Sequence, residues 1–536
     1  MSKFRIYFIF CFLVLSALSL SNCAKRGYIT GGPQDTIPPV VLRSTPANFT
    51  TNFKENIIYI DFDEFIKVNK LNQNLIISPP LENTPEVSPM GSAKKRITIR
   101  LRDTLKENTT YSFNFGDAII DNNEGNVLKQ FKYIFSTGDY IDSLKIKGSI
   151  SSINQIKADN FVNIMLYDAK TFNDSTVYKE KPLYITNTLD SLTDFTVENI
   201  KEGSYYIIAL KDKNNNYLFD PKQDKIGFIK DPITIPSDQV HKIVLFKSNE
   251  KLETSRPSQV SKNKWYLPFF GDVEDAIVTV AKNDSLIRST YTALAQKDSL
   301  QVWFPEVKAD SLYINVKKED YNKTYTVKPR VKIDAIDSLS ISATNSILHY
   351  VNDFTINTTT PIEKINQTLI TVLNKDSVAI PYEVDHKKLE QRILLKFNKE
   401  ENANYYINLM PNALTDFFGK TNDTLNYEVK TAPYSDYGNL FLKFTGIKRY
   451  PIIVEIVDEK ENVIASQYSE QESDFNFLLL SPRKYYVRII YDDNKNKKWD
   501  SGYYWEKTQP EEVIYFPELI DVRANWDIQQ DINFEK

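Results

Sequence analysis

The sequence predicts an all-β protein built from tandem β-sandwich modules behind a secretion signal. Tyr and Phe number 32 and 31, whereas Met numbers only 4, and aromatic and β-branched residues favour strands. Short runs such as 58–62 and 97–101 alternate apolar and polar residues, and clusters of Asn, Asp, Gly and Pro separate them. This alternation is typical of antiparallel sheets with one buried face. No convincing helical stripe follows the first 23 residues, which is why we expect sheets throughout.

The N-terminus carries the signal. Lys3 and Arg5 precede an apolar run over residues 6–20, which is short for a membrane span of roughly 20 residues. The run ends in Leu20-Ser21-Asn22-Cys23, which resembles the lipobox of bacterial lipoproteins. The resemblance implies a signal peptide over 1–22, a diacylglycerol on the Cys23 thiol, and an acyl chain such as palmitate on the new amine. The alternative is an ordinary secretory signal with a chance Cys.

Cysteine usage restricts the chemistry of the folded part. The chain has two Cys; Cys11 leaves with the signal and Cys23 receives the lipid. A disulfide framework, a Cys-ligated zinc and a Cys nucleophile are therefore excluded. Residues 23–37 are rich in Gly and Pro, so we predict a non-helical lipidated tether there.

One module occurs twice. Residues 105–113, followed by Asp121, Gly125 and a closing strand over 131–138, resemble the bacterial Ig-like domains of S-layer proteins and envelope lipoproteins. The resemblance implies a sandwich over 38–138. Residues 401–409 repeat 107–115 at a constant spacing of 294, and Asp416 matches Asp121. We therefore predict a second Ig-like domain over 335–432.

A second kind of module is also duplicated. Asp194-Phe195, Tyr205-Tyr206 and the loop from Asp212 recur 280 residues later without a gap, ending at Asp500. The surroundings resemble small transthyretin-like or carboxypeptidase-regulatory-like sandwiches. This implies transthyretin-like domains over 143–250 and 436–536. Runs at 276–280, 300–304 and 311–316 predict a further β domain over 251–334.

The duplicated loop is the one group of residues in the sequence that suggests a ligand-binding site. Oxygen side chains at loop positions 1, 3 and 5 converge on one point, as in the loops that bind Ca²⁺, and the loop resembles calcium loops of surface-protein sandwiches. The alternative is a plain turn, in which Asn and Asp accumulate without metal. Position 13 of the second loop is Tyr504, which cannot replace a carboxylate, and the alternative donor there is Glu506. We therefore expect the first loop, with three carboxylates against two at matching positions, to bind structural Ca²⁺ more tightly. The candidate ligands are Asp212, Asn214, Asn216, Asp220 and Asp224 in the first loop and Asp492, Asn494, Asn496 and Asp500 in the second.

Enzyme chemistry and nucleic-acid binding find no support in the sequence. It holds no Gly-rich phosphate loop, no His-Glu-x-x-His and no Gly-x-Ser-x-Gly motif, and His241, His349 and His386 are scattered. Lys and Arg total 66 against 70 Asp and Glu, for a net charge of −4, so there is no basic field for nucleic acid. We expect a non-enzymatic protein without a small-molecule substrate.

Two function classes remain. The first is a structural or interaction scaffold that contacts the membrane through its lipid and other envelope proteins through its modules, for example as an accessory subunit of an outer-membrane protein complex. The second is a glycan- or peptidoglycan-binding surface module with exposed aromatic platforms. The candidate platforms are Trp265, Trp303, Trp499 and Trp505.

The residues after Cys23 favour the outer membrane. Ala24-Lys25 lacks the Asp that commonly retains lipoproteins at the inner membrane, and residues 24–34 hold no acidic residue. The export signals known for some surface lipoproteins are acidic. We therefore favour the periplasmic face over the cell surface.

Overall fold

The computed structural model describes residues 35–153, 155–189, 193–295, 297–330, 333–343 and 346–534. The predicted signal peptide, Cys23 and most of the tether lie outside these residues. The chain divides into two compact units, of which the first ends at Ile141 and the second begins at Asp142 and includes residues 77–80. Within the described part of the chain, no helix is long and apolar enough to cross a membrane.

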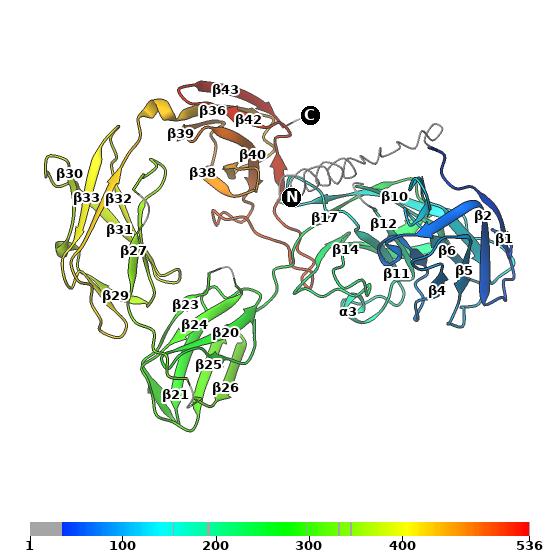
Figure 1. Ribbon diagram of the computed structural model, residues 1–536, viewed down its shortest axis with the longest axis horizontal. Helices are drawn as coiled ribbons and strands as arrows, with labels where there is room; N and C mark the ends of the chain where they lie inside the picture. The colour runs from blue at the N-terminus through cyan, green and yellow to red at the C-terminus, as the bar shows by residue number, and fades with distance from the viewer. Residues whose placement is uncertain are drawn as a thin grey trace, which may run out of the picture. The chain divides into compact units, whose positions relative to one another are not determined.

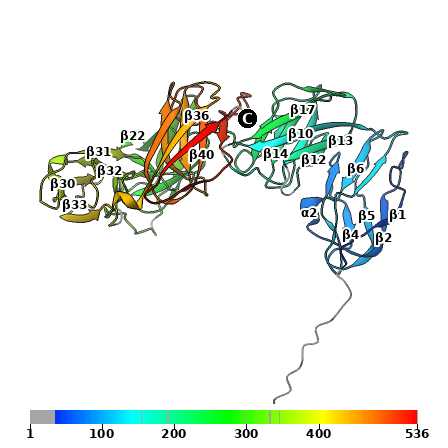
Figure 2. The ribbon, with the colours of Figure 1, turned by 90° about the horizontal axis from the view of Figure 1, so that it is seen from above.

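The first unit is a sandwich of two antiparallel sheets (Figure 2). The alternation of buried and exposed side chains predicted from the sequence is present. Ile58, Ile60 and Phe62 are buried, whereas Tyr59 and Asp61 between them are half-exposed. The larger sheet contains β1 (Val41–Thr45), β2 (Ile57–Val68), β4 (Glu86–Ser88), β5 (Lys94–Arg100), β7 (Ile119–Asp121) and β8 (Val127–Leu128). The smaller sheet contains β3 (Ile76–Ser78), β6 (Thr110–Asn114) and β9 (Lys132–Ser136), and a single turn, α2 (Leu71–Asn74), follows β2.

A Tyr and a Thr secure the loop that enters β6. The hydroxyl of buried Tyr111 accepts a hydrogen bond from the Lys106 N–H at 2.9 Å. The Thr137 hydroxyl accepts from the Thr109 N–H at 2.9 Å and donates to the Lys106 carbonyl at 2.7 Å. These bonds satisfy loop backbone groups that no strand reaches.

The same arrangement recurs in the predicted second copy, again at a spacing of 294 residues. The Tyr405 hydroxyl accepts from the Glu400 N–H at 2.6 Å, and the Thr431 hydroxyl accepts from the Ala403 N–H at 3.0 Å and donates to the Glu400 carbonyl at 2.6 Å. The sequence repeat therefore corresponds to a repeated hydrogen-bond network.

The 335–432 module consists of β-sheets around one apolar core. Its four-stranded sheet contains β27 (Ile341–Ala343), β28 (Phe354–Thr358), β31 (Tyr382–Lys387) and β32 (Arg392–Phe397). Its other strands are β29 (Ile362–Ile365), β30 (Ile370–Asn374), β33 (Asn404–Leu409), β34 (Leu414–Asp416) and β35 (Leu425–Lys430), with 3-10 turns η1 (Gln367–Leu369) and, just after the module, η2 (Tyr434–Asp436).

The 143–250 module packs a three-stranded sheet against a five-stranded one. The three-stranded sheet contains β10 (Leu144–Ser152), β13 (Asp194–Ile200) and β17 (Val240–Leu245), with β10 and β17 parallel. The five-stranded sheet contains β11 (Asn163–Asp168), β12 (Tyr184–Asn187), β14 (Gly203–Lys211), β15 (Lys225–Phe228) and β16 (Ile233–Ile235), and the short helix α3 (Thr176–Lys179) follows β11.

The 436–536 module repeats this topology strand for strand, including the parallel pair (Figure 1). Its three-stranded sheet contains β36 (Gly438–Thr445), β39 (Asp474–Leu480) and β43 (Asp527–Asn533). Its five-stranded sheet contains β37 (Ile452–Val457), β38 (Val463–Ser469), β40 (Arg483–Tyr491), β41 (Val513–Tyr515) and β42 (Ile520–Val522).

The 251–334 module is also a sandwich, and the three strands predicted from its sequence correspond to β21, β24 and β25. One sheet contains β18 (Glu253–Thr254), β19 (Ser258–Gln259), β20 (Lys264–Phe270), β23 (Thr290–Ala293) and β24 (Ser299–Trp303). The other contains β21 (Ile277–Lys282), β22 (Ser285–Ile287), β25 (Leu312–Lys318) and β26 (Tyr321–Val327). The all-β tandem fold predicted from the sequence is thus confirmed.

The repeated Tyr network gives a stability prediction. Tyr111→Phe and Tyr405→Phe each remove the acceptor of one loop N–H, so each is expected to lower the free energy of unfolding of its own module by about 1 kcal/mol. Hydrogen exchange of the β6–β9 or β33–β35 amides in the full soluble chain would report the loss. Tyr140→Phe is the control, because Tyr140 is 57% exposed. Equal exchange in all three variants would contradict a role for these hydroxyls.

Candidate functional site

The first Asp-x-Asn-x-Asn loop connects β14 to β15 and is organised by Asp212. Its carboxylate accepts the Asn214 N–H at 2.9 Å and the Tyr217 N–H at 2.8 Å. Asn215 and Tyr217 have left-handed φ angles of 53° and 62°. Asn tolerates this region better than most residues, so the Asn-rich sequence suits the turn.

Asp224 ties the two ends of this loop together. It is fully buried, and its two oxygens accept the Lys213 N–H at 2.9 Å and the Asp220 N–H at 2.8 Å. Burial raises the pKa of the Asp224 carboxyl, and the two N–H bonds oppose that rise. The side chain thus joins loop position 2 to loop position 9.

The second loop, between β40 and β41, has the same backbone. The Asp492 carboxylate accepts the Asn496 N–H at 3.1 Å and the Lys497 N–H at 2.8 Å. The left-handed residues are Lys495 and Lys497, each with φ of 64°, which correspond to Asn215 and Tyr217 at the spacing of 280. Lys stands at both left-handed positions of the second loop, so the turn does not require Asn there.

Glu511 makes in the second loop the hydrogen bonds that Asp224 makes in the first. It is 8% exposed, and its carboxylate accepts the Asp493 N–H at 2.8 Å and the Asp500 N–H at 3.1 Å. These donors correspond to Lys213 and Asp220. Burial raises the pKa of Glu511, and the backbone N–H bonds again oppose the rise.

Tyr504, although at position 13, is therefore not the counterpart of Asp224, and the expectation of only two carboxylates in the second loop is wrong. Up to Asp500 the copies are 280 residues apart, but Ile490 pairs with Val513 where Leu210 pairs with Ile226, so the spacing beyond the loop is 287. Ten residues separate Asp500 from Glu511 where three separate Asp220 from Asp224, an insertion of seven. The expected ranking of the two loops loses its basis, because each holds three carboxylates.

The loop amides do not direct their oxygens at one common point. Asn494 and Asn496 donate their side-chain N–H groups to Asp500 at 2.7 Å and 2.6 Å. The Asn216 side-chain oxygen accepts the Leu218 N–H at 2.9 Å. Over the described ranges, no three His, Cys, Asp or Glu side chains are grouped closely enough to hold a metal ion. In this arrangement the loops are braced by hydrogen bonds, and calcium binding stays a prediction.

Two of the proposed aromatic platforms are wrong. Trp265 and Trp303 are 3% and 0% exposed. Trp265 on β20 belongs to the core of its own sandwich, whereas Trp303 on β24 alternates with the core residues Leu300 and Val302 and meets the Phe418 ring of the 335–432 module at a centroid distance of 6.3 Å. Trp499 is half-buried, and Trp505 stacks on Tyr178 at a ring-centroid distance of 5.5 Å. The four residues do not supply a row of open aromatic faces.

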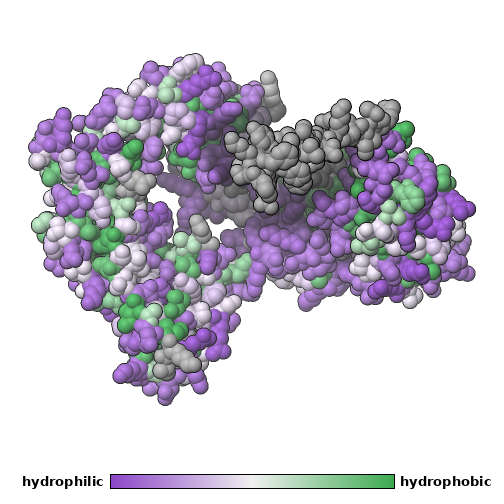
Figure 3. All heavy atoms as spheres, in the orientation of Figure 1, coloured by the Kyte–Doolittle hydropathy of each residue, from purple (hydrophilic) through white to green (hydrophobic). Residues whose placement is uncertain are grey.

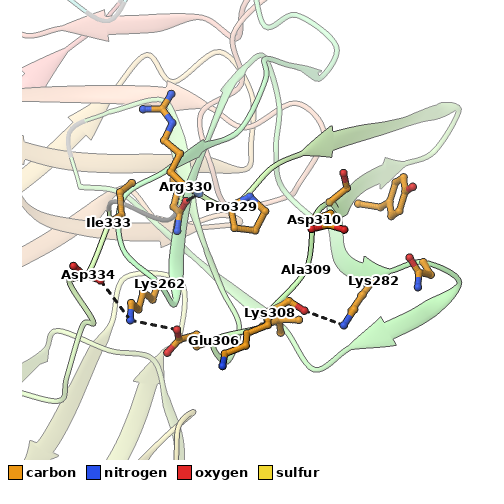
Figure 4. Close-up of a pocket in the computed structure, with 15 residues that line it drawn as sticks. Lys262, Lys282, Glu306, Lys308, Ala309, Asp310, Pro329, Arg330, Ile333 and Asp334 are labelled. Atoms are coloured by element: carbon orange, nitrogen blue, oxygen red, sulfur yellow. Dashed lines mark hydrogen bonds and ion pairs between the residues drawn. The ribbon is translucent and has the colours of Figure 1, made fainter.

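The 251–334 module has a polar hollow of about 860 Å³ (Figure 4). Lys262 lies 3.3 Å from the Glu306 carboxylate and 3.8 Å from that of Asp334. Lys282 donates to the Lys308 carbonyl at 2.9 Å. Among the described residues that line the hollow there is no Cys or His, and Lys262 pairs with two of the lining carboxylates, as on an ordinary polar surface.

The comparisons support the fold of the first unit. Residues 35–137 match the family model of the bacterial Ig-like domain. The match confirms the resemblance seen in the sequence, and it covers the sandwich with the Tyr111 network. The comparison with curated protein sequences gave no match.

Solved structures similar to the chain are remote. The S-layer protein rSbsC(31-844) is 12% identical with a TM-score of 0.15, and the match covers 85% of this chain and 64% of that one. BcpA, the major pilin subunit of Bacillus cereus, is 10% identical with a TM-score of 0.14, over 73% of this chain and 99% of that one. The chain therefore spans about 64% of the length of the S-layer protein it matches. These TM-scores are too low to place the whole chain on either structure.

The two bracing carboxylates are open to test. Asp224→Ala and Glu511→Ala each remove the carboxylate that accepts two loop N–H groups, so each is expected to lower the free energy of unfolding of its module by about 1–3 kcal/mol. Urea denaturation of the full soluble chain, followed by hydrogen exchange in β15 or β41, measures the effect. Lys213→Ala is the control, because it changes an exposed side chain in the same loop. A Glu511→Ala chain as stable as this control would contradict the equivalence of the two carboxylates.

The calcium prediction needs its own measurement. With dissociation constants of roughly 10⁻⁴ to 10⁻³ M, ~10 mM Ca²⁺ would stabilise each occupied module by about 1–3 kcal/mol, which raises the Tm of the full chain. Asp212→Ala is expected to remove the contribution of the first loop, and Asp492→Ala that of the second. Thermal melts in calcium and in chelator compare them. An unchanged wild-type Tm would mean that both loops are ordinary turns.

Proposed function

We propose that the chain is a non-enzymatic, lipid-anchored cell-envelope protein that acts as a structural and interaction scaffold. Its place would be that of an accessory subunit of an outer-membrane protein complex. The observation that carries the proposal is that neighbouring sandwiches of the second unit are joined by side-chain contacts, as a stiff spacer requires.

The contacts between the 251–334 and 335–432 modules illustrate this. The Gln301 side chain donates to the Gln391 side chain at 2.9 Å. Arg288 donates to the Phe417 carbonyl at 2.8 Å, and its guanidinium lies 4.2 Å from the centre of the Phe417 ring. A cation over an aromatic face combined with a hydrogen bond gives a directional contact. Such contacts support a function in which spacing between modules matters.

The outer surface suits contact with other proteins through mixed polar groups. On the face drawn in Figure 3, hydrophilic side chains predominate and hydrophobic ones are scattered. Large apolar patches, when present, mark obligate interfaces or membrane contact. The anchoring part of the proposal rests instead on the sequence around Cys23, and two or more acyl chains hold a protein stably on a bilayer. We place the protein on the periplasmic face of the outer membrane.

Replacing the lipidated residue tests the anchor. Cys23→Ser is expected to release the protein from the membrane fraction or to leave it unprocessed, because Ser offers no thiol to the diacylglycerol. Cys11→Ser is the matched control, since Cys11 lies within the predicted signal. Immunoblots of fractionated cells report both. A mature-sized, membrane-bound Cys23→Ser protein would overturn the anchor, and degradation by protease added to intact cells would overturn the periplasmic placement.

The scaffold role is tested by crosslinking in membranes followed by affinity capture of the lipidated chain. Recovery of the same outer-membrane protein from wild-type cells, and its loss from Cys23→Ser cells, would support the scaffold. Recovery of peptidoglycan without protein would favour the glycan-binding alternative instead.

A further inference from the structure

The seven-residue insertion in the second loop contacts a different module. In the first loop, Asp220 and Asp224 are joined by residues 221–223, whereas residues 501–510 separate Asp500 from Glu511. We call residues 501–510 the clasp. The clasp leaves the 436–536 module and lies against the 143–250 module, within the same compact unit (Figure 1).

Backbone groups hold the clasp in a defined register. Within it, Tyr503 and Thr508 exchange two N–H to carbonyl bonds of 3.0 Å. Toward the other module, the Asn249 N–H donates to the Gly502 carbonyl at 2.8 Å, and the Tyr504 N–H donates to the Ser248 hydroxyl at 3.1 Å. Some 250 residues separate the partners in sequence, so chain connectivity does not impose these bonds.

Tyr504 is the centre of the contact. Its side chain is fully buried, and its ring meets those of Tyr178, Phe219 and Phe228 edge-on at centroid distances of 5.9, 5.9 and 5.6 Å. Edge-to-face pairs are the favoured geometry of aromatic rings and each adds about 0.5–1.5 kcal/mol to the burial of the ring. We call Tyr178, Phe219 and Phe228 the aromatic socket.

Two further contacts close the socket. Lys507 pairs with the Asp174 carboxylate at 2.9 Å while its ammonium lies 3.6 Å from the centre of the Tyr504 ring. Gly502 packs so closely on Phe246 that a Cβ there would come within 2.7 Å of the ring and 2.6 Å of the Thr508 carbonyl. Only glycine fits at that point.

The contact also has a cost. Among the described residues, no hydrogen-bond partner reaches the buried Tyr504 and Tyr178 hydroxyls or one oxygen of Glu250, which lies beside Ser248. A buried polar group left unpaired costs about 1–3 kcal/mol. These unpaired groups offset part of the free energy gained by burying the Tyr504 ring. A contact with a small net stabilisation can open and close.

We propose that the clasp is an intramolecular latch: Tyr504, seated in the aromatic socket, locks the 436–536 module onto the 143–250 module. The seven extra residues serve this contact and not the loop that carries them, because Glu511 restores the bracing that Asp224 gives the shorter loop. The two duplicated modules thereby move as one body while the latch is closed and separate when Tyr504 leaves the socket.

Distance measurements on the full chain test the latch. Once Cys23 carries its lipid the mature chain has no other Cys, so Cys introduced at the exposed positions Lys230 and Glu459 can be spin-labelled specifically. Pulsed electron–electron double resonance is expected to give one narrow distribution of distances between the two labels in the otherwise wild-type chain. Tyr504→Ser is expected to replace it with a broad distribution, and Tyr503→Ser, a change of the same size at the adjacent half-exposed residue, to leave it narrow.

A second variant, in which the loop is exchanged, distinguishes loss of the latch from misfolding of the Tyr504→Ser chain. Replacing residues 501–510 with residues 221–223 removes the clasp and keeps Glu511 in a loop of the length that the first copy uses. This variant is also expected to lose the narrow distance while its β40–β41 amides stay protected from exchange. A narrow distance that survives the loop exchange would overturn the latch. So would a wild-type distance that depends on protein concentration, since that would mean the clasp docks on a second copy.

Discussion

Backbone N–H groups in the loops between strands must find acceptors once burial removes water, and the regular features of this protein follow from how it meets that need. Side-chain oxygens supply the acceptors: Tyr111 and Tyr405 in one pair of modules, Asp224 and Glu511 in the other. Each sits beneath its loop with little or no exposure. Because an unpaired buried N–H costs more than a hydrogen bond returns, these positions hold the loop shape in both copies.

The duplicated Asp-x-Asn loops show how much change such bracing tolerates. The residues at positions 2 and 9 are held by an aspartate four residues beyond Asp220 in one copy and by a glutamate eleven residues beyond Asp500 in the other. The additional methylene of Glu and the intervening segment leave the pairing of β40 with β41 equivalent to that of β14 with β15. An insertion between two braced ends costs the fold little, since the entropy of closing a loop grows slowly with its length. The inserted residues are then available for contacts elsewhere.

Contacts between modules set how the second unit can work as a scaffold. Sandwiches joined only by linkers reorient freely, whereas Arg288 on Phe417 and Tyr504 in its socket fix neighbours through directional groups. In the proposed scaffold, these contacts would present the surfaces of the modules at a defined spacing. Removing the latch would change that spacing without touching any sheet.

The sequence by itself determined the all-β class, the alternation that buries Ile58 and Ile60, and both duplications, because period-two burial and gap-free repeats are visible in linear order. It also placed the Asp and Asn side chains of each loop on one turn. Only the tertiary structure decided that Glu511 and not Tyr504 completes the second loop, since an insertion hides which carboxylate returns to the same two N–H groups. It likewise decided that Trp303 is buried beside the Phe418 ring of the next module and that Tyr504 fills a socket about 250 residues away. Those outcomes depend on which face of a sheet a side chain meets and on which module packs against it. Neither can be deduced from the spacing of residues along the sequence.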